Sequence, residues 1–438
     1  MRNTKTKNNW YVPKAAFAAF GVYFCMYAFR KPFTIASFEG ITYWGVDYKV
    51  LLIIAQVIGY FLSKFIGIKI VSELKEKDRL KFLFGFITFA FLTLLGFAVT
   101  PRPYNIFFMF LNGLPLGMIW GIVFSYIEGR KATEILGLIL CTSFVVSSGF
   151  VKSVGKFTLS YFGVSEFWMP FLTGLWFIIP LVFFGLLLDR LPKPSKEDIA
   201  YKTKRVPLNQ KERKKLILTF WIPLFFLTIL YVSLTILRDF RDNFTGEIWD
   251  ALGFKDAVSL YTYAEIPIAF TVLLVLSFMI TIKNNTKAFL LYHYILLTGV
   301  LLIGLSTIAF SSHLLSPMPW MIITGIGMYL CYIPFNGLFF DRMIASFKIK
   351  GNVGFLIYFV DSFGYLGSIL ILLFKNFGYK KISWLHFYIQ LNYAIAIIGF
   401  FTILIAAIQF QRKINKMNSV PQSEEEEEET SFQLQELK

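Results

Sequence analysis

The sequence predicts an all-α polytopic membrane protein whose twelve transmembrane helices form two halves of six. Three observations support this fold class. Of the 438 residues, 56% are hydrophobic and 16% are charged, whereas soluble domains carry about 25% charged residues. Apolar runs of about 18 to 25 residues recur, and each is long enough to cross a hydrocarbon core about 30 Å thick. A long basic segment divides these runs into two equal sets.

The apolar runs fix where the spans are expected. They lie at residues 14–38, 48–72, 81–99, 104–127, 133–157, 167–188, 217–241, 259–282, 288–310, 319–341, 353–374 and 389–410. Basic residues gather after the even-numbered spans, and the longest such segment, 189–215, holds ten Lys or Arg. Under the positive-inside rule this predicts that both termini are cytoplasmic. One expected outer loop, with Lys375, Lys380 and Lys381, departs from the rule.

The same pattern predicts the domain organisation. Residues 1–188 are expected to form the first half, 189–216 a cytoplasmic linker, 217–410 the second half and 411–438 a cytoplasmic tail. Two six-span halves joined by a polar linker are typical of a secondary transporter. The tail contains the acidic run SEEEEEET, which has no apolar partner and is expected to be disordered.

Composition also excludes several functions. The net charge of +16 resides in the loops, so it does not indicate a nucleic-acid partner. Cys25, Cys141 and Cys331 lie inside apolar runs without metal-binding spacing, and no polar catalytic cluster appears. We therefore expect no enzyme, cofactor or metal, but a monomer surrounded by lipid in a bacterial-type inner membrane.

Charged residues within the spans mark the candidate site. Each one costs about 2.5–3.5 kcal/mol at the bilayer centre on insertion scales, so each needs a partner or a water-filled cavity. The set comprises Arg30, Lys64, Lys152, Arg238, Arg241, Glu265 and Asp361. Because the basic members outnumber the acidic ones, a cavity that they line would attract an anion. The planar fork of arginine suits phosphate or carboxylate.

Tyrosines accompany two of these cations at helical spacing. Tyr27 and Tyr23 precede Arg30 by three and seven residues, and Tyr60 precedes Lys64 by four. Residues at these spacings share a helix face, and phenol hydroxyls can donate to anion oxygens. We expect the three tyrosines to line a central cavity.

Snorkelling to lipid headgroups is the structural alternative for each cation. It applies to Arg30, Lys64 and Arg238, and interface anchoring is the favoured interpretation for Lys31 and Lys152. Local ion pairs at the outer mouth are the corresponding alternative for Asp239, Arg241 and Asp242. The position of Arg238 adds a depth objection, because it follows Lys215 by 23 residues. A straight helix would place it about 34 Å along, which is too far.

A helix restart would remove this objection. Pro223 lies between the basic linker and Arg238, where it can end an interfacial segment and begin the span anew. We therefore expect the seventh span to restart near Pro223.

Six short motifs now carry a family resemblance. They are YFCMYAFRKPF (23–33), SKF (63–65), GLPLGMIW (113–120), TILR (235–238), YTYAEIP (261–267) and FGYLGS (363–368). In content and order they resemble the major facilitator superfamily, and within it the organophosphate:phosphate antiporters, which carry glycerol 3-phosphate and hexose phosphates. The resemblance touches six of the twelve expected spans.

The resemblance implies a site as well as a fold. By it, Arg30 and Arg238 would be symmetry-related residues that clamp the phosphate. The residues implied around them are Lys64, Tyr23, Tyr27, Tyr60 and Trp120.

The chain also departs from the family pattern. Ser143 stands near an expected histidine, Thr235 replaces a tyrosine, and Asp361 replaces a small residue. The acidic residue of the eighth span has moved one turn, from Thr262 to Glu265. These departures indicate a side branch and leave the substrate open.

Three functions fit the sequence. The leading hypothesis is a secondary transporter that moves a small organic anion, phosphorylated by the resemblance, through alternating access, with inorganic phosphate as a candidate counter-substrate. The second is a proton-coupled symporter of a sugar, peptide or drug, for which Asp361 is the candidate proton site. The third is a sensor that binds a sugar phosphate without transporting it.

Two geometric expectations follow for the charges. Arg30 and Arg238 should face each other across the pseudo-two-fold axis, and repulsion should strain their empty site until an anion or Glu265 lies between them. Glu265 or Asp361 should lie within ion-pairing distance of a basic residue, either to balance Arg238 or to carry protons.

Overall fold

The computed structural model describes residues 11–129, 132–192, 198, 210–255, 257–349, 353–378 and 382–419. The first part of this chain contains α1 (Tyr11–Met26), η1 (Tyr27–Phe29), η2 (Pro32–Ile35), β1 (Thr42–Tyr43), β2 (Val46–Asp47), α2 (Tyr48–Glu73), η3 (Glu76–Asp78), α3 (Arg79–Val99), α4 (Ile106–Ile127), α5 (Thr133–Phe162), α6 (Met169–Trp176) and α7 (Ile178–Asp189). The second part contains α9 (Gln210–Thr219), α10 (Trp221–Asn243), α11 (Thr245–Ala251), α12 (Leu260–Ile280), α13 (Asn285–Ser311), α14 (Pro317–Tyr332), η4 (Ile333–Asn336), α15 (Leu338–Ser346), α16 (Val353–Gly378) and α17 (Trp384–Asn418).

The chain is an integral membrane protein built from helices. Within the described ranges, 11 helical segments are long and apolar enough to cross a membrane, and α6 with α7, bent by 46°, would make a twelfth if they cross as one span. The only strands recorded there, β1 and β2, have two residues each and pair in an antiparallel hairpin. The predicted fold class is confirmed.

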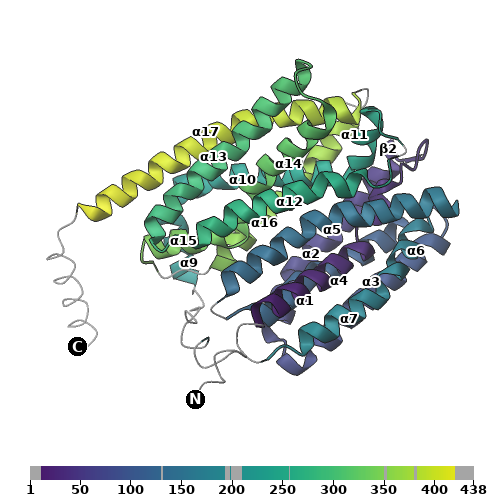
Figure 1. Cartoon of the computed structure of the whole chain (residues 1–438), viewed down its shortest axis with the longest axis horizontal. Coiled ribbons are helices and arrows are strands. Elements are labelled where there is room, and N and C mark those ends of the chain that lie inside the picture. Colours follow the sequence, from purple (N-terminus) through teal and green to yellow (C-terminus); the bar gives the residue numbers. More distant parts are fainter. Residues whose placement is uncertain are drawn as a thin grey trace.

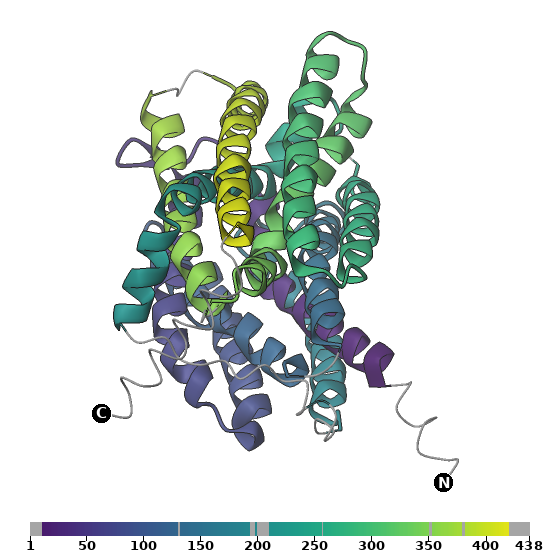
Figure 2. The same cartoon turned by 90° about the vertical axis from the view of Figure 1, so that its left-hand side faces the viewer.

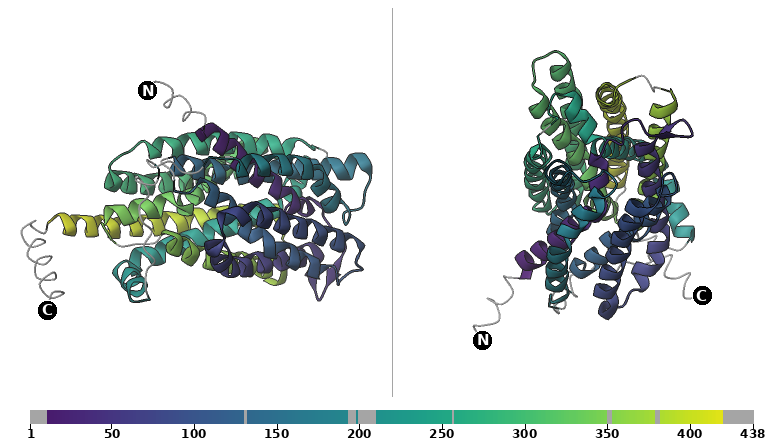
Figure 3. Two further views of the ribbon diagram at one scale, coloured as in Figure 1. Left: turned by 90° about the horizontal axis from the view of Figure 1, so that it is seen from below. Right: turned by 90° about the vertical axis from the view of Figure 1, so that its right-hand side faces the viewer.

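The helices pack in two groups. In the first, α4 packs against α2 and α3, and α1 packs against α5 and α7. In the second, α17 packs against α10 and α13, and α10 also contacts α16. Figure 1 shows the first group in purple to blue and most of the second in green to yellow, and the turned views of Figures 2 and 3 show the same division. The two groups meet mainly where α5 packs against α12 and α2 against α16.

Glycines permit the closest of these helix contacts. A Cβ at Gly113 would lie 2.2 Å from the Gln56 carbonyl oxygen, so α4 and α2 touch backbone to backbone there. At Gly149, in α5, a Cβ would lie 2.4 Å from the Tyr261 carbonyl oxygen of α12. Small residues allow membrane helices to approach in this way without a hydrophobic driving force. The GLPLGMIW motif therefore has a packing role.

The first span is not one helix. It was expected over 14–38, but α1 ends at Met26 and short 3₁₀ turns follow. Pro32 lacks an N–H donor, so an α-helix that continued through it would lose the hydrogen bond to the Ala28 carbonyl. Gln56 Nε2 donates to the Arg30 carbonyl at 3.0 Å, and Asn112 Nδ2 donates to the Phe29 carbonyl at 3.1 Å. These amides satisfy the carbonyls that the broken helix exposes, as irregular backbone inside a membrane requires.

Three other boundaries bear on the expected layout. α9 ends at Thr219 and α10 begins at Trp221, which is the restart expected near Pro223 and places Arg238 in the last third of α10. The tenth span breaks after Tyr332, where Pro334 follows in a 3₁₀ turn. α17 continues to Asn418, so the first residues of the expected tail are helical, and the acidic run and most of the expected linker lie outside the described residues.

Different elements lie at the two ends of the helix bundle. In Figure 1, α9, α15 and the end of α17 lie at the left, and β2, α11 and α6 lie at the right. The broken ends of α1 and α14 lie between them and line the region described next.

Candidate functional site

A cavity of about 630 Å³ lies between the two helix groups. Both groups line it, through α2, α4 and α5 on one side and α10, α14 and α16 on the other. Its lining continues to Arg79, Glu128, Arg213 and Asp341, which lie at the end of the molecule that carries α9 and α15. A concave, partly polar space at the interface of two helical units is where small-molecule sites are usually found.

The structure brings nearly all predicted site residues to this cavity. Its lining includes Tyr23, Tyr27, Arg30, Tyr60, Lys64, Trp120, Arg238 and Asp361. The expectation that the three tyrosines line the cavity is confirmed. The lining does not include Glu265, nor two other charges of the predicted set, Lys152 and Arg241.

Arg30 sits at the broken end of α1. Only 9% of the residue is exposed, and its Cζ lies 4.0 Å from the Tyr60 ring centroid and 5.8 Å from that of Tyr27. Its Nε has no hydrogen-bond partner within the described residues, and no carboxylate there lies within ion-pairing distance of its guanidinium. Arg30 is thus a buried cation held by aromatic faces, with donors left for an anion.

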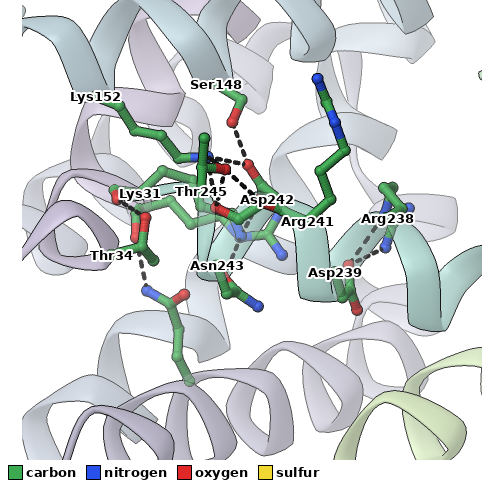
Figure 4. Close-up of polar contacts among 12 residues, drawn as sticks. Lys31, Thr34, Ser148, Lys152, Arg238, Asp239, Arg241, Asp242, Asn243 and Thr245 are labelled. Carbon is green, nitrogen blue, oxygen red and sulfur yellow. Dashed lines mark hydrogen bonds and ion pairs between the residues drawn. The ribbon is translucent and has the colours of Figure 1, made fainter. Parts of the chain in front are cut away.

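Arg238 differs from Arg30 in its partners. Its Nε and Nη2 donate to Asp239 Oδ1 at 3.0 and 2.7 Å, and its Nη1 donates to the Tyr332 hydroxyl. Asp239 Oδ2 in turn accepts from Ser368 Oγ at 2.7 Å. The expectation of two unpaired arginines therefore needs correction, because Arg238 already has a carboxylate of its own. Figure 4 shows this pair beside the α10 backbone.

Asp361 joins the other predicted lysine. Its Oδ2 lies 3.5 Å from Lys64 Nζ, and its Oδ1 accepts a hydrogen bond from Tyr231. The Tyr231 hydroxyl lies 3.1 Å from that of Tyr332, which also contacts Arg238. Ion pairing of Asp361 was expected and is confirmed. The carboxylate thereby belongs to a polar network that reaches Arg238.

Glu265 pairs with a different arginine from the one expected. Its Oε1 lies 2.7 Å from Arg241 Nη1, and the two side chains are 9% and 3% exposed. Ion pairing of this carboxylate is confirmed, but Asp239 is the carboxylate that contacts Arg238. The Arg241–Glu265 pair packs between α10 and α12, outside the cavity lining.

We therefore expect Glu265→Gln to act on stability rather than on the cavity. Removing the carboxylate leaves Arg241 buried and unpaired, which typically costs about 3–5 kcal/mol. Thermal unfolding of the purified protein should show a clear fall in Tm. Glu166→Gln is the matched control, because Glu166 is partly exposed and caps backbone N–H groups, so its loss should lower Tm less. An unchanged Tm for Glu265→Gln would mean that the ion pair with Arg241 does not contribute to the stability of the fold.

A second ionic cluster was not found by sequence reasoning. Asp242 binds Lys31, lies 2.6 Å from Lys152 Nζ and accepts a hydrogen bond from Ser148 (Figure 4). Lys31 Nζ also donates to Asn243 Oδ1 at 2.8 Å. Lys31 and Lys152 were expected to be interface anchors, but they are 4% and 3% exposed and join the two helix groups. Asp242 follows Arg238 by four residues, and that helical spacing was the available signal.

A further ion pair lies nearby, toward β2 and α11. Lys49 of α2 binds Glu247 of α11 and donates to the Thr34 carbonyl at 2.5 Å. Burial raises the pKa of the Glu247 carboxyl above its ordinary value, and the Lys49 ammonium opposes that shift. With the Asp242 cluster, this pair closes the interface between the groups at the end opposite α9.

Comparison with known proteins gives a family and a fold. The model of a family described as "Family of unknown function (DUF5690)" matches residues 32–413. None of the curated proteins compared with the chain matches it. A D-xylose-proton symporter structure aligns with a TM-score of 0.61 at 12% identity, covering 90% of this chain and 96% of that one.

Two further solved structures align over similar lengths. A mutant of the nucleoside transporter NupG gives a TM-score of 0.58 at 14% identity, with 92% of this chain and 99% of that one covered. The human organic anion transporter MFSD10 (TETRAN) gives 0.55 at 11% identity, with 90% and 99% coverage. At such identities the likeness concerns the fold alone. That fold is the major facilitator fold.

Proposed function

The chain belongs to DUF5690, a family of unknown function, and we propose that it is a secondary transporter that moves a small organic anion by alternating access. The observation that carries this proposal is Arg30, a buried cation with a free Nε in a cavity between two helix groups. A cation is retained in such a place when it has a partner to bind, because burying it otherwise is unfavourable.

The surroundings of Arg30 favour an anion with a compact, multi-oxygen head. Tyr23, Tyr27 and Tyr60 present hydroxyls in the same cavity, and Lys64 adds a second cation. Guanidinium and phenol donors around one point match a phosphate or a carboxylate. A phosphorylated substrate is the finer proposal, and it rests on the motif resemblance in which Arg30, Lys64 and Arg238 occur together.

The structure has one end open through the cavity and the other end closed by ion pairs, and we take it as one state of the proposed cycle. The cavity extends to the α9 end, and the Asp242 cluster and the Lys49–Glu247 pair join the groups at the other end. With both termini cytoplasmic, as the basic loops predict, this state faces the cytoplasm. Transport then requires these ion pairs to separate while the α9 end closes.

A proton-coupled symporter is the second candidate, and Asp361 is the observation that favours it. This residue is a carboxylate in the cavity lining, 6% exposed, whose nearest recorded cation is 3.5 Å away. Carboxylates that line the transport path inside a membrane are the groups that proton-coupled carriers use. One of the structures with the same fold is that of a D-xylose-proton symporter.

Thermal-shift screening tests the anion proposal. Ligands that bind only the folded protein raise its apparent stability, by about 2.7 kcal/mol at a concentration one hundred times Kd. We expect phosphorylated or carboxylated metabolites to raise Tm, whereas neutral analogues of the same size should not. If neutral sugars raise Tm and none of the anions does, the symporter candidate is favoured and the anion proposal fails.

A further inference from the structure

Asp239 occupies the position on Arg238 that an anion would take. Its Oδ1 accepts from two nitrogens of the guanidinium, and Ser368 holds its other oxygen. The residue is 8% exposed and lines the cavity beside Arg238. Both bonds go to one carboxylate oxygen, so the contact is not a two-oxygen fork, but it occupies the Nε–Nη2 edge of the guanidinium that an oxyanion would use.

The neighbouring carboxylates pair with other cations. Asp242 is held by Lys31 and Lys152, and Asp361 by Lys64 and Tyr231. Asp239 is therefore the carboxylate that the structure records on Arg238. Arg30 keeps its charge without a recorded carboxylate, and its guanidinium rests on the Tyr60 ring.

This arrangement matters when the carrier is empty. Alternating access passes through an occluded state in which the cavity loses contact with bulk water. Two unpaired guanidinium groups would oppose that step, because desolvating a charge without a partner is unfavourable. A carboxylate on Arg238 removes one of the two charges before any substrate arrives.

We propose that Asp239 is an internal counter-ion that replaces the substrate anion on Arg238, so that the empty carrier changes orientation unaided and performs net transport rather than obligatory exchange. This inference rests on the proposed function. It also implies competition, because an anion that uses Arg238 must displace the Asp239 carboxylate.

The test measures reorientation of the empty protein, and therefore needs no identified substrate. Ile35 packs against Gly246 across the closed end and is 7% exposed. A cysteine at Ile35 should react with a bulky maleimide only when that end opens. The three native cysteines are buried, so we expect little maleimide labelling of them. This background labelling is measured in the protein without Ile35→Cys. The purified protein in nanodiscs, in chloride buffer without organic anions, gives the labelling rate.

We expect Ile35→Cys to be labelled steadily without organic anions. Adding Asp239→Asn should slow that labelling on the order of tenfold, because Arg238 is then unpaired in the occluded state. The double change Arg238→Gln with Asp239→Asn removes both charges and should restore the original rate, which also separates the effect from misfolding. Glu73→Gln removes a carboxylate that is exposed and lies outside the cavity lining, so it is the control and should leave the rate unchanged.

Two results would overturn the inference. One is labelling of Ile35→Cys that begins only after inorganic phosphate is added, which would indicate obligatory exchange. The other is an Asp239→Asn variant that labels as fast as the parent protein. The proposed function fails separately, if no phosphorylated or carboxylated metabolite raises Tm, and that result does not depend on the labelling rates.

Discussion

Replacing Arg30 by lysine is expected to weaken anion binding about ten- to a hundredfold, because one charge-assisted hydrogen bond worth about 1.5–3 kcal/mol is lost. Lysine keeps the charge but has no planar fork, and it cannot stack on Tyr60 as the guanidinium does at 4.0 Å. Arg30→Gln should leave no measurable binding. Binding is measured by calorimetry or by thermal-shift titration with the best anion from the screen.

The control for this prediction makes the same chemical change elsewhere in the cavity. Arg79 lines the mouth and stacks on Tyr126 at 5.4 Å. We expect Arg79→Lys to change anion affinity less than about threefold, because a charge at a hydrated mouth is screened. Equal losses at the two positions would mean that the cavity attracts anions by its overall charge and has no site at Arg30.

Replacing Asp242 by asparagine is expected to open the closed end of the molecule. The change leaves Lys31 and Lys152 buried without their shared carboxylate, and breaking a buried ion pair costs about 3–5 kcal/mol. The free-energy difference that favours the closed state should therefore shrink. In the open state, water can solvate both ammonium groups. Labelling of a cysteine at Ile35 should therefore become faster, the opposite of the effect expected for Asp239→Asn.

Asp239 and Asp242 are only three residues apart, yet their replacement by asparagine should change the labelling rate in opposite directions. This contrast makes the result diagnostic. Glu39→Gln is the control, because Glu39 is exposed near the same end and lies outside the Asp242 cluster. It should leave labelling at Ile35 unchanged. If Asp242→Asn slows labelling, or lowers Tm without changing the labelling rate, the cluster stabilises the fold generally and does not hold this end closed.

The candidate site was largely predictable because its residues break the pattern of their surroundings. Arg30, Lys64, Arg238 and Asp361 interrupt apolar runs, and an ionisable side chain in such a run requires a polar environment wherever the helix packs. Tyrosines at helical spacing shared the face of those charges, so periodicity placed them as well. These inferences need only the local helix and the membrane as solvent.

The sequence did not predict which acidic residue pairs with which basic residue. Asp239 was the adjacent residue and Glu265 the residue suggested by family position, yet the carboxylate on Arg238 is Asp239 and Glu265 binds Arg241. Lys31 and Asp242 are separated by more than two hundred residues and meet only because the two helix groups pack together. Interface anchoring and burial cannot be told apart when a cation lies near the end of an apolar run.

The sequence by itself determined that the chain crosses a membrane about twelve times, and that its intramembrane charges mark a central site, since hydropathy and the cost of a buried charge are local properties. Only the tertiary structure decided that α1 breaks at the site, that Arg30 keeps free donors while Arg238 is neutralised, and that Asp242 joins the two helix groups. The physical reason is that an ion pair depends on distances of a few ångströms between helices, and those distances are set by packing over the whole bundle.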